Sequence, residues 1–280
     1  SSGHNLKEIT ARRADPDKGA AYFAALFDSC ARLMLGIVDN PKPVIAEGGI
    51  ISAAAFGAFK GVSPGTWVEI YGSNLSATTG EWSGGDFNGT TAPTKLGGVT
   101  VTIAGKSAFI RYISPGQVNV QAPDGIGTGP VQVVVTSQDV ASDPVNITAY
   151  NTLPGLLQLG NGYVAAFQGS TIVGSPGFAP VKPGDTIVLY GIGFGPTNPL
   201  VPAGQITPAP ASGQNTITSA LGIVIGGSSP TMSYQGLPPG FVGLYQFNLT
   251  VPSIPDGDQP LTVAVGGNPN GQSLKLTVKR

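Results

Sequence analysis

Apolar and polar residues alternate in short runs from Val62 to the end of the chain, and turns rich in glycine and proline separate the runs. A period of two predicts β-strands with one buried face. In the first half we expect strands at Trp67–Tyr71, Val99–Ile103, Phe109–Ile113, Gln117–Gln121 and Val131–Val135. In the second half we expect them at Pro154–Leu157, Tyr163–Gln168, Thr171–Val173, Thr186–Tyr190, Leu221–Ile225, Thr231–Tyr234, Leu244–Val251, Leu261–Val265 and Leu274–Val278. The regular spacing of the runs favours an antiparallel sandwich.

The pattern contains an internal repeat. Val62–Gly72 and Val181–Gly191 each read as a Pro-Gly turn, an alternating strand and a Tyr-Gly end. The matched positions are Pro64, Gly65, Tyr71 and Gly72 in the first copy and Pro183, Gly184, Tyr190 and Gly191 in the second. A repeat of this length indicates two copies of one structural unit.

Two further segments match in the same order. Gln117–Pro123 is similar to Gln246–Pro252, and Gly129–Val131 is echoed by Gln259–Leu261. We expect Tyr71 and Tyr190 to occupy equivalent places. Asn119 and Asn248 lie in mid-strand in both copies, and we expect their side-chain amides to hydrogen-bond a neighbouring loop backbone.

The N-terminal segment has a different pattern, with charged residues concentrated between Lys7 and Glu47. Asp15-Pro16 is typical of a helix start, and apolar residues recur at helical spacing until Asp39-Asn40-Pro41. The pattern predicts one amphipathic helix, whose apolar positions are Tyr22, Phe23, Leu26, Phe27, Cys30, Leu33, Met34, Ile37 and Val38.

Within this segment, Ser2–Glu8 resembles the acyl-CoA loop of the enoyl-CoA hydratase (crotonase) family, and Pro43–Ala46 resembles the buried strand that follows it. The resemblance implies one half of an oxyanion hole at the backbone N–H of His4. Ala55 stands where the family's second donor glycine would fall, and the family's downstream catalytic carboxylates are absent. We therefore interpret this segment as a crotonase remnant.

The rest of the chain resembles the paired immunoglobulin-like (IPT/TIG-like) module of large extracellular bacterial proteins. The residues that carry this resemblance are Gly48–Phe56, Pro64–Leu75, Gly116–Asn119 and Gly240–Asn248. The resemblance implies an exported setting and brings no catalytic residue or ligand with it. We predict an all-β fold of two tandem immunoglobulin-like β-sandwiches, residues 48–152 and 153–280, with an N-terminal helical appendage, residues 1–47.

Composition excludes several classes of chemistry. The net charge of -1 offers no basic field for nucleic acid. One histidine and one cysteine, His4 and Cys30, cannot build a nucleophilic triad or a zinc site within the sandwiches. Asp256 and Asp258 are better explained by a turn than by calcium, and Glu69 by a solvated face. We expect no catalytic residue, metal, cofactor or inserted membrane segment.

The best candidate binding residues lie in a long insertion after the first repeated strand, Ser73–Lys95, which carries Glu81, Trp82 and Phe87. Loops at one end of a rigid sandwich often bind ligands, and an aromatic face suits a sugar ring or a partner. The alternative is that Trp82 covers the open end of its own sandwich. A second insertion, Ile192–Thr218, follows the matched strand, and Gly236–Gly243 could be a recognition loop or a hairpin.

The sequence therefore predicts a non-catalytic structural, adhesion or spacer module. Its expected partners are other domains of a parent protein or cell-surface polymers, and its expected location is extracellular or at the cell surface. A carbohydrate-binding module that uses the loop around Trp82 is the alternative. A remnant acyl-CoA-binding segment is a more remote one.

Overall fold

The computed structural model describes residues 24–27, 34, 40–54, 59–209, 215–266, 268–269 and 272–280. The chain divides into two compact units, Ser1–Pro41 and Lys42–Arg280. In the first unit Ala24–Phe27 and Met34 are helical, as the sequence predicts for these positions. His4 and Ala55, to which the crotonase resemblance assigned roles, lie outside the described residues.

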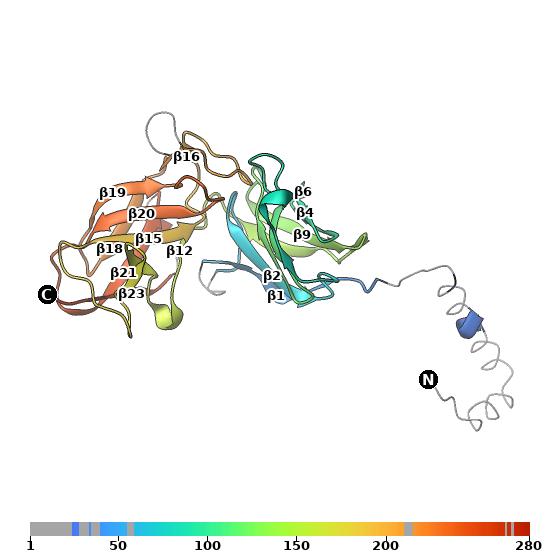
Figure 1. Cartoon of the computed structure of the whole chain (residues 1–280), viewed down its shortest axis with the longest axis horizontal. Coiled ribbons are helices and arrows are strands. Elements are labelled where there is room, and N and C mark those ends of the chain that lie inside the picture. The colour runs from blue at the N-terminus through green and yellow to red at the C-terminus, as the bar shows by residue number, and fades with distance from the viewer. Residues whose placement is uncertain are drawn as a thin grey trace, which may run out of the picture. The chain divides into compact units, whose positions relative to one another are not determined.

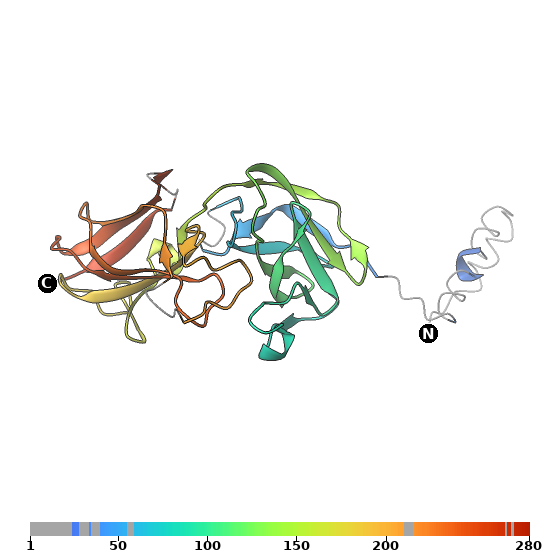
Figure 2. The ribbon, with the colours of Figure 1, turned by 90° about the horizontal axis from the view of Figure 1, so that it is seen from above.

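The second unit contains two β-sandwiches (Figures 1 and 2). Each sandwich has its own apolar core. One sheet of the first sandwich has the strand order β1-β2-β8-β7-β3, and the other has β10-β9-β5-β4, with β11 and β6 pairing at its sides. Its strands are β1 (Val44–Ser52), β2 (Trp67–Ser73), β3 (Gly80–Glu81), β4 (Lys95–Leu96), β5 (Val99–Ile103), β6 (Lys106–Ser107), β7 (Phe109–Ile113), β8 (Gln117–Gln121), β9 (Gly129–Ser137), β10 (Val140–Ala141) and β11 (Val145–Ala149).

The second sandwich has one sheet with the strand order β14-β13-β15-β20-β19-β17-β16 and another with the order β18-β21-β22. In addition, β12 pairs with β15 in the first of these sheets, and β23 pairs with β21 in the second. Its strands are β12 (Gly155–Leu156), β13 (Ala166–Gln168), β14 (Thr171–Val173), β15 (Thr186–Ile192), β16 (Thr197–Asn198), β17 (Thr216–Ile217), β18 (Leu221–Ile225), β19 (Thr231–Gly236), β20 (Tyr245–Thr250), β21 (Gly257–Val265), β22 (Asn268–Pro269) and β23 (Leu274–Val278). The predicted fold class is confirmed.

The strand pairing confirms that the two tyrosines are equivalent. Tyr71 pairs with Gln117 between β2 and β8, and Tyr190 pairs with Gln246 between β15 and β20. The third matched segment falls on the equivalent strands β9 and β21, but two residues out of register. Val133 pairs with Ile103, and Leu261 pairs with Ile225. This pairing makes Val133 equivalent to Leu261 and hence Gly129 equivalent to Gly257, and these two glycines begin their strands.

Several strand ends differ from the sequence prediction. The predicted strand from Tyr163 begins at Ala166 in β13, because a 3-10 turn at Gly160–Gly162 precedes it. β1 runs from Val44 to Ser52 and pairs with β2, so one strand of the first sandwich crosses the predicted division between residues 47 and 48. The three-part division of the chain remains a prediction.

Candidate functional site

The two long insertions meet each other between the sandwiches. The backbone N–H of Ala92 donates to the carbonyl of Gly204 at 2.7 Å, and the N–H of Ile206 donates to the carbonyl of Thr90 at 2.8 Å. Side chains continue this pairing, because Gln205 exchanges hydrogen bonds with the hydroxyls of Thr90 and Thr91. The insertions therefore form a short antiparallel contact instead of two free loops. We call this region the sandwich junction.

A buried glutamine spans the sandwich junction. Gln121 is only 2% exposed; its Nε2 donates to the carbonyl of Gly65 at 3.0 Å, and its Oε1 accepts from the N–H of Gly204 at 2.7 Å. The indole Nε1 of Trp67 adds a bond of 2.9 Å to the carbonyl of Val242. A buried amide that satisfies groups on both sandwiches holds them together, because losing either partner would leave a polar group unpaired.

Two glycines leave no room for a side chain at the sandwich junction. A Cβ at Gly204 would lie 2.2 Å from the ring of Phe109, and one at Gly243 would lie 2.0 Å from Nε2 of Gln121. Both residues also have positive φ, 79° and 62°. The close approach of the sandwiches here therefore requires glycine twice over.

A cleft of about 560 Å³ opens beside the sandwich junction. We call it the junction cleft. Its walls come from both sandwiches: Ala53, Trp67, Val68, Glu69, Trp82, Phe87, Arg111 and Asn119 from the first, and Leu157, Ile192, Ile206, Gly240, Phe241, Val242 and Leu244 from the second. The structure thus brings Trp82 and Phe87 into one site, and Glu81 lies at its edge through its ion pair with Arg111, at 2.9 Å.

Three aromatic rings form a contact series in the junction cleft. The centroids of Trp82 and Trp67 are 5.5 Å apart with an edge-on angle of 78°, and those of Trp82 and Phe87 are 5.0 Å apart at 58°. All three side chains are half-buried. Trp82 therefore packs on the outward-facing Trp67 of β2, within a cleft that both sandwiches line.

A short turn holds the aromatic loop in place. The N–H of Trp82 donates to the carbonyl of Arg111 at 2.9 Å, which fixes the loop against β7. A 3-10 turn at Gly84–Asp86 follows, closed by hydrogen bonds from the backbone and hydroxyl of Ser83 to the carboxylate of Asp86 at 2.7 and 2.8 Å. These bonds lower the pKa of Asp86. The turn separates Trp82 from Phe87 by a fixed path.

Polar groups lie beside the aromatic rings. Glu69 accepts a hydrogen bond of 2.8 Å from the hydroxyl of Tyr71. Burial, together with this bond and the charge of Glu69, raises the pKa of Tyr71 to about 12. The expected solvated position of Glu69 needs correction, since the residue is half-buried and lines the junction cleft.

The predicted hydrogen-bond partner of the two mid-strand asparagines is wrong. Oδ1 of Asn119 accepts from Nε2 of Gln117 at 2.8 Å, and Oδ1 of Asn248 accepts from Nε2 of Gln246 at the same distance. Both hydrogen bonds are local, because the side chains of residues i and i+2 lie on the same face of a strand. Both copies therefore display a pair of linked amides on their outer sheet.

Sequence reasoning missed Trp67 and Arg111 as members of the site. Trp67 occupies an outward strand position where the second copy has Thr186, and Arg111 stands where the second copy has Ser233. The sequence does carry a signal for these two residues. Each is a large aromatic or charged residue at an outward strand position where the other copy has a small residue.

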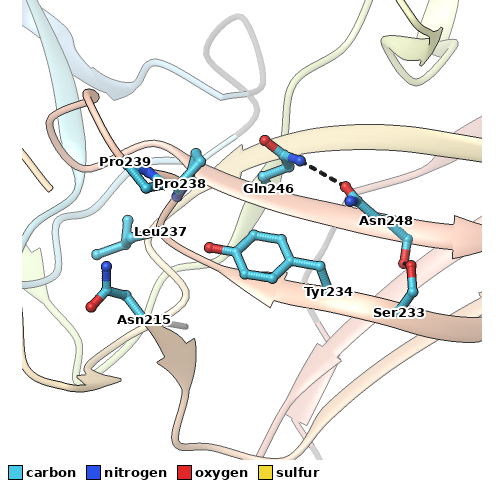
Figure 3. Close-up of a pocket in the computed structure, with 8 residues that line it drawn as sticks. All are labelled: Asn215, Ser233, Tyr234, Leu237, Pro238, Pro239, Gln246 and Asn248. Carbon is cyan, nitrogen blue, oxygen red and sulfur yellow. Dashed lines mark hydrogen bonds between the residues drawn. The ribbon is translucent and has the colours of Figure 1, made fainter. Parts of the chain in front are cut away.

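The second sandwich carries a separate pocket of about 460 Å³ on its outer sheet, shown in Figure 3. We call it the Tyr234 pocket. It is lined by Asn215, Ser233, Tyr234, Leu237, Pro238, Pro239, Gln246 and Asn248. The candidate loop Gly236–Gly243 is thus divided between two sites, since its first half lines this pocket and its second half lines the junction cleft.

The described part of the chain contains no group of three metal-binding side chains, and none of its helices is long and apolar enough to cross a membrane. The carboxylates of the candidate calcium turn bind protein groups. Asp258 accepts from the hydroxyls of Tyr163 and Thr277, and Asp256 accepts from the N–H of Arg280.

Comparison with known proteins supports part of the fold assignment. Residues 59–149 match the IPT/TIG domain family. A stretch of 55 residues, 20% of the chain, is 42% identical to the human mitochondrial enoyl-CoA hydratase domain-containing protein 3, and the corresponding stretch is 46% identical to the Xenopus laevis protein. These stretches cover only 16% and 17% of those relatives.

Two solved structures align with most of this chain. The Bacteroides ovatus mixed-linkage glucan utilization locus protein SGBP-B, in complex with a heptasaccharide, is 15% identical, with a TM-score of 0.37 over 86% of this chain and 47% of its own. Domains 5–6 of the S-layer protein SbsC are 14% identical, with a TM-score of 0.26 over 85% and 98%. At these scores neither similarity supports a function for this chain.

Proposed function

We propose that the chain is a non-catalytic, exported module that holds two immunoglobulin-like sandwiches in one fixed relative orientation. Such a module spaces or presents other domains of a larger parent protein at a cell surface. The observation that carries the proposal is the sandwich junction, where Gln121 and the paired insertions link the two sandwiches through hydrogen bonds. A flexible linker would need none of these contacts.

Small-angle scattering and ¹⁵N relaxation of the full chain test this proposal. The wild-type sandwiches should tumble with one correlation time. Gly243→Val places a side chain against Gln121 and should give two correlation times and a larger maximum dimension. Gly227→Val is the matched control, because Gly227 also has positive φ, at 80°, but nothing lies within 4 Å of its Cβ position. Two correlation times in the wild type would contradict a fixed orientation.

We propose carbohydrate binding in the junction cleft as a second candidate function. The observation that favours it is the gathering of Trp82, Trp67 and Phe87 beside Glu69 and Asn119. Aromatic faces pack on the C–H faces of sugar rings, and carboxylate and amide groups exchange hydrogen bonds with sugar hydroxyls. The cleft volume of about 560 Å³ lies within the usual range for ligand sites.

Intrinsic fluorescence tests this second candidate directly. The chain has two tryptophans, and both line the junction cleft. Titration with cellohexaose, xylohexaose, laminarihexaose, mannohexaose and chitohexaose should quench their emission for at least one of the five. Trp82→Ala should remove that response, whereas Phe178→Ala, which deletes an exposed ring outside the cleft, should retain it. Unchanged emission with all five sugars would exclude this function for them.

We propose acyl-CoA binding by the N-terminal segment only as a remote alternative, supported by the similarity of 55 residues of the chain to enoyl-CoA hydratase-domain proteins. Equilibrium dialysis of the full chain against acetyl-CoA, with His4→Pro as the variant that removes the backbone donor, tests it. Retention that is equal for both proteins would exclude the oxyanion role of His4.

A further inference from the structure

We propose that the Tyr234 pocket is a second binding site for an uncharged oligosaccharide, equivalent by internal repeat to the outer sheet face beside the junction cleft. The inference takes its ligand class from the second candidate function above. Its residues, its sandwich and its experiment are separate.

The two faces have the same backbone frame. β7 and β8 shift register between Ile110 and Tyr112, so Arg111 is an extra residue, and Tyr112 pairs with Asn119. β19 and β20 shift register at the same point, so Ser233 is the extra residue, and Tyr234 pairs with Asn248. A bulge of this kind re-aims neighbouring side chains and often lies beside functional sites. Both copies retain it next to the linked amide pair.

The lining of the Tyr234 pocket matches a neutral, hydroxyl-rich ligand. Figure 3 shows the Tyr234 ring extending from its strand toward Leu237, with the amides of Gln246 and Asn248 on the neighbouring strand. None of the residues that line the pocket is charged. A phosphate, a nucleotide or a metal ion would therefore find no counter-charge, whereas a sugar ring can pack on the tyrosine face.

Polar atoms remain available for the ligand. Gln246 uses Nε2 and Asn248 uses Oδ1 in their mutual bond, which leaves Oε1 of Gln246 as an acceptor and Nδ2 of Asn248 as a donor among the described residues. The hydroxyl of Tyr234 likewise makes no hydrogen bond among the described residues. A tyrosine hydroxyl carries its proton at neutral pH and can therefore donate; burial raises the pKa of this one further. An acceptor and two donors beside a ring suit neighbouring sugar hydroxyls.

The wall of the pocket is held in place before any ligand arrives. The N–H of Leu237 donates to the carbonyl of Asn215 at 2.9 Å, and the N–H of Gly240 donates to the carbonyl of Thr207 at 2.9 Å. Between these anchors lie Pro238 and Pro239, whose rings fix φ. A preformed wall lowers the entropy lost on binding.

Calorimetry on the full chain tests the second site with the same five hexaoses. In a Trp82→Ala background, which disables the junction cleft, at least one sugar should still bind with one site per chain. Adding Tyr234→Ala should weaken that binding about tenfold or more. Tyr234→Phe should keep most of it, because the ring remains. Tyr150→Ala, which removes another partly exposed tyrosine, is the control and should change nothing. Thermal unfolding confirms that each variant is folded.

The outcomes separate the two sites. Tryptophan quenching that survives Tyr234→Ala, with no residual heat in Trp82→Ala, overturns the second site and leaves the junction cleft standing. Binding heat that depends on Tyr234, without tryptophan quenching, supports the second site and overturns carbohydrate binding in the junction cleft. No heat and no quenching with any of the five sugars overturns both.

Discussion

The outer sheet of the first sandwich and that of the second share a frame but differ in chemistry. Both display a tyrosine, Tyr71 or Tyr190, beside a linked Gln–Asn pair. The first sheet adds Trp67, Glu69 and Arg111 at the positions where the second has Thr186, Val188 and Ser233. The second covers its tyrosine differently, because Phe167 of β13 meets Tyr190 edge-on at 5.7 Å. The repeat preserves the backbone, and outward side chains together with the inserted loops decide which chemical groups each face presents.

Core substitutions test how far the equivalence reaches. Ile70 and Leu189 are fully buried at equivalent positions. Ile70→Ala and Leu189→Ala should each lower the free energy of unfolding by about 2–5 kcal/mol, from lost burial and the cavity left behind. Urea unfolding gives the magnitude, and hydrogen exchange shows which sandwich is weakened. A loss below about 1 kcal/mol for either variant would break the comparison.

The sandwich junction should reveal the largest asymmetry between the copies. Gln121→Ala removes a buried amide and should cost about 1–3 kcal/mol, because the carbonyl of Gly65 and the N–H of Gly204 lose their partner. Thr250 holds the equivalent strand position but is half-buried, and its side chain makes no hydrogen bond among the described residues. Thr250→Ala should therefore change stability by less than about 0.5 kcal/mol. Urea unfolding measures both losses of unfolding free energy. Equal losses for the two variants would contradict the expected difference between the two strand ends.

The smallest effect that we expect is on the way stability changes with alkaline pH. The folded-state pKa of Tyr71 is raised to about 12 from an ordinary value of 10.0, so the folded chain retains this proton when the unfolded chain has lost it. The stabilisation is fully present below pH 10.0, and it is lost as pH rises toward 12. Tyr71→Phe should make stability fall less steeply in this window. Glu69→Gln should have part of that effect, since burial is the main cause of the shift. An unchanged slope in Tyr71→Phe would contradict the raised pKa.

The sequence predicts the strands well because alternation and turns are local signals. Val99–Ile103, Phe109–Ile113 and Gln117–Gln121 have the predicted bounds. It also predicts Trp82 and Phe87 as candidate binding residues, and the structure places both in one cleft. The partners of this pair come from the other sandwich and from an outward strand position. Periodicity within one strand carries no information on such contacts.

The loop pairing escapes prediction for a related reason. Ala92 and Gly204 belong to insertions that lack strand alternation, and they meet only where the two sandwiches lie against each other. The bulges at Arg111 and Ser233 are equally invisible in the alternation, since an extra residue looks like an interruption of the strand.

The glycines of the sandwich junction carry a consequence for other chains of this architecture. Gly204 and Gly243 are separated in sequence, but at each position the atom that a side chain would strike, in Phe109 or Gln121, belongs to the other sandwich. A related tandem chain with glycine at both aligned positions and glutamine at the position of Gln121 should share this interdomain angle. A chain with a bulky residue at either position must adopt another. Three letters of an alignment would then sort such chains by geometry before any of their structures is known.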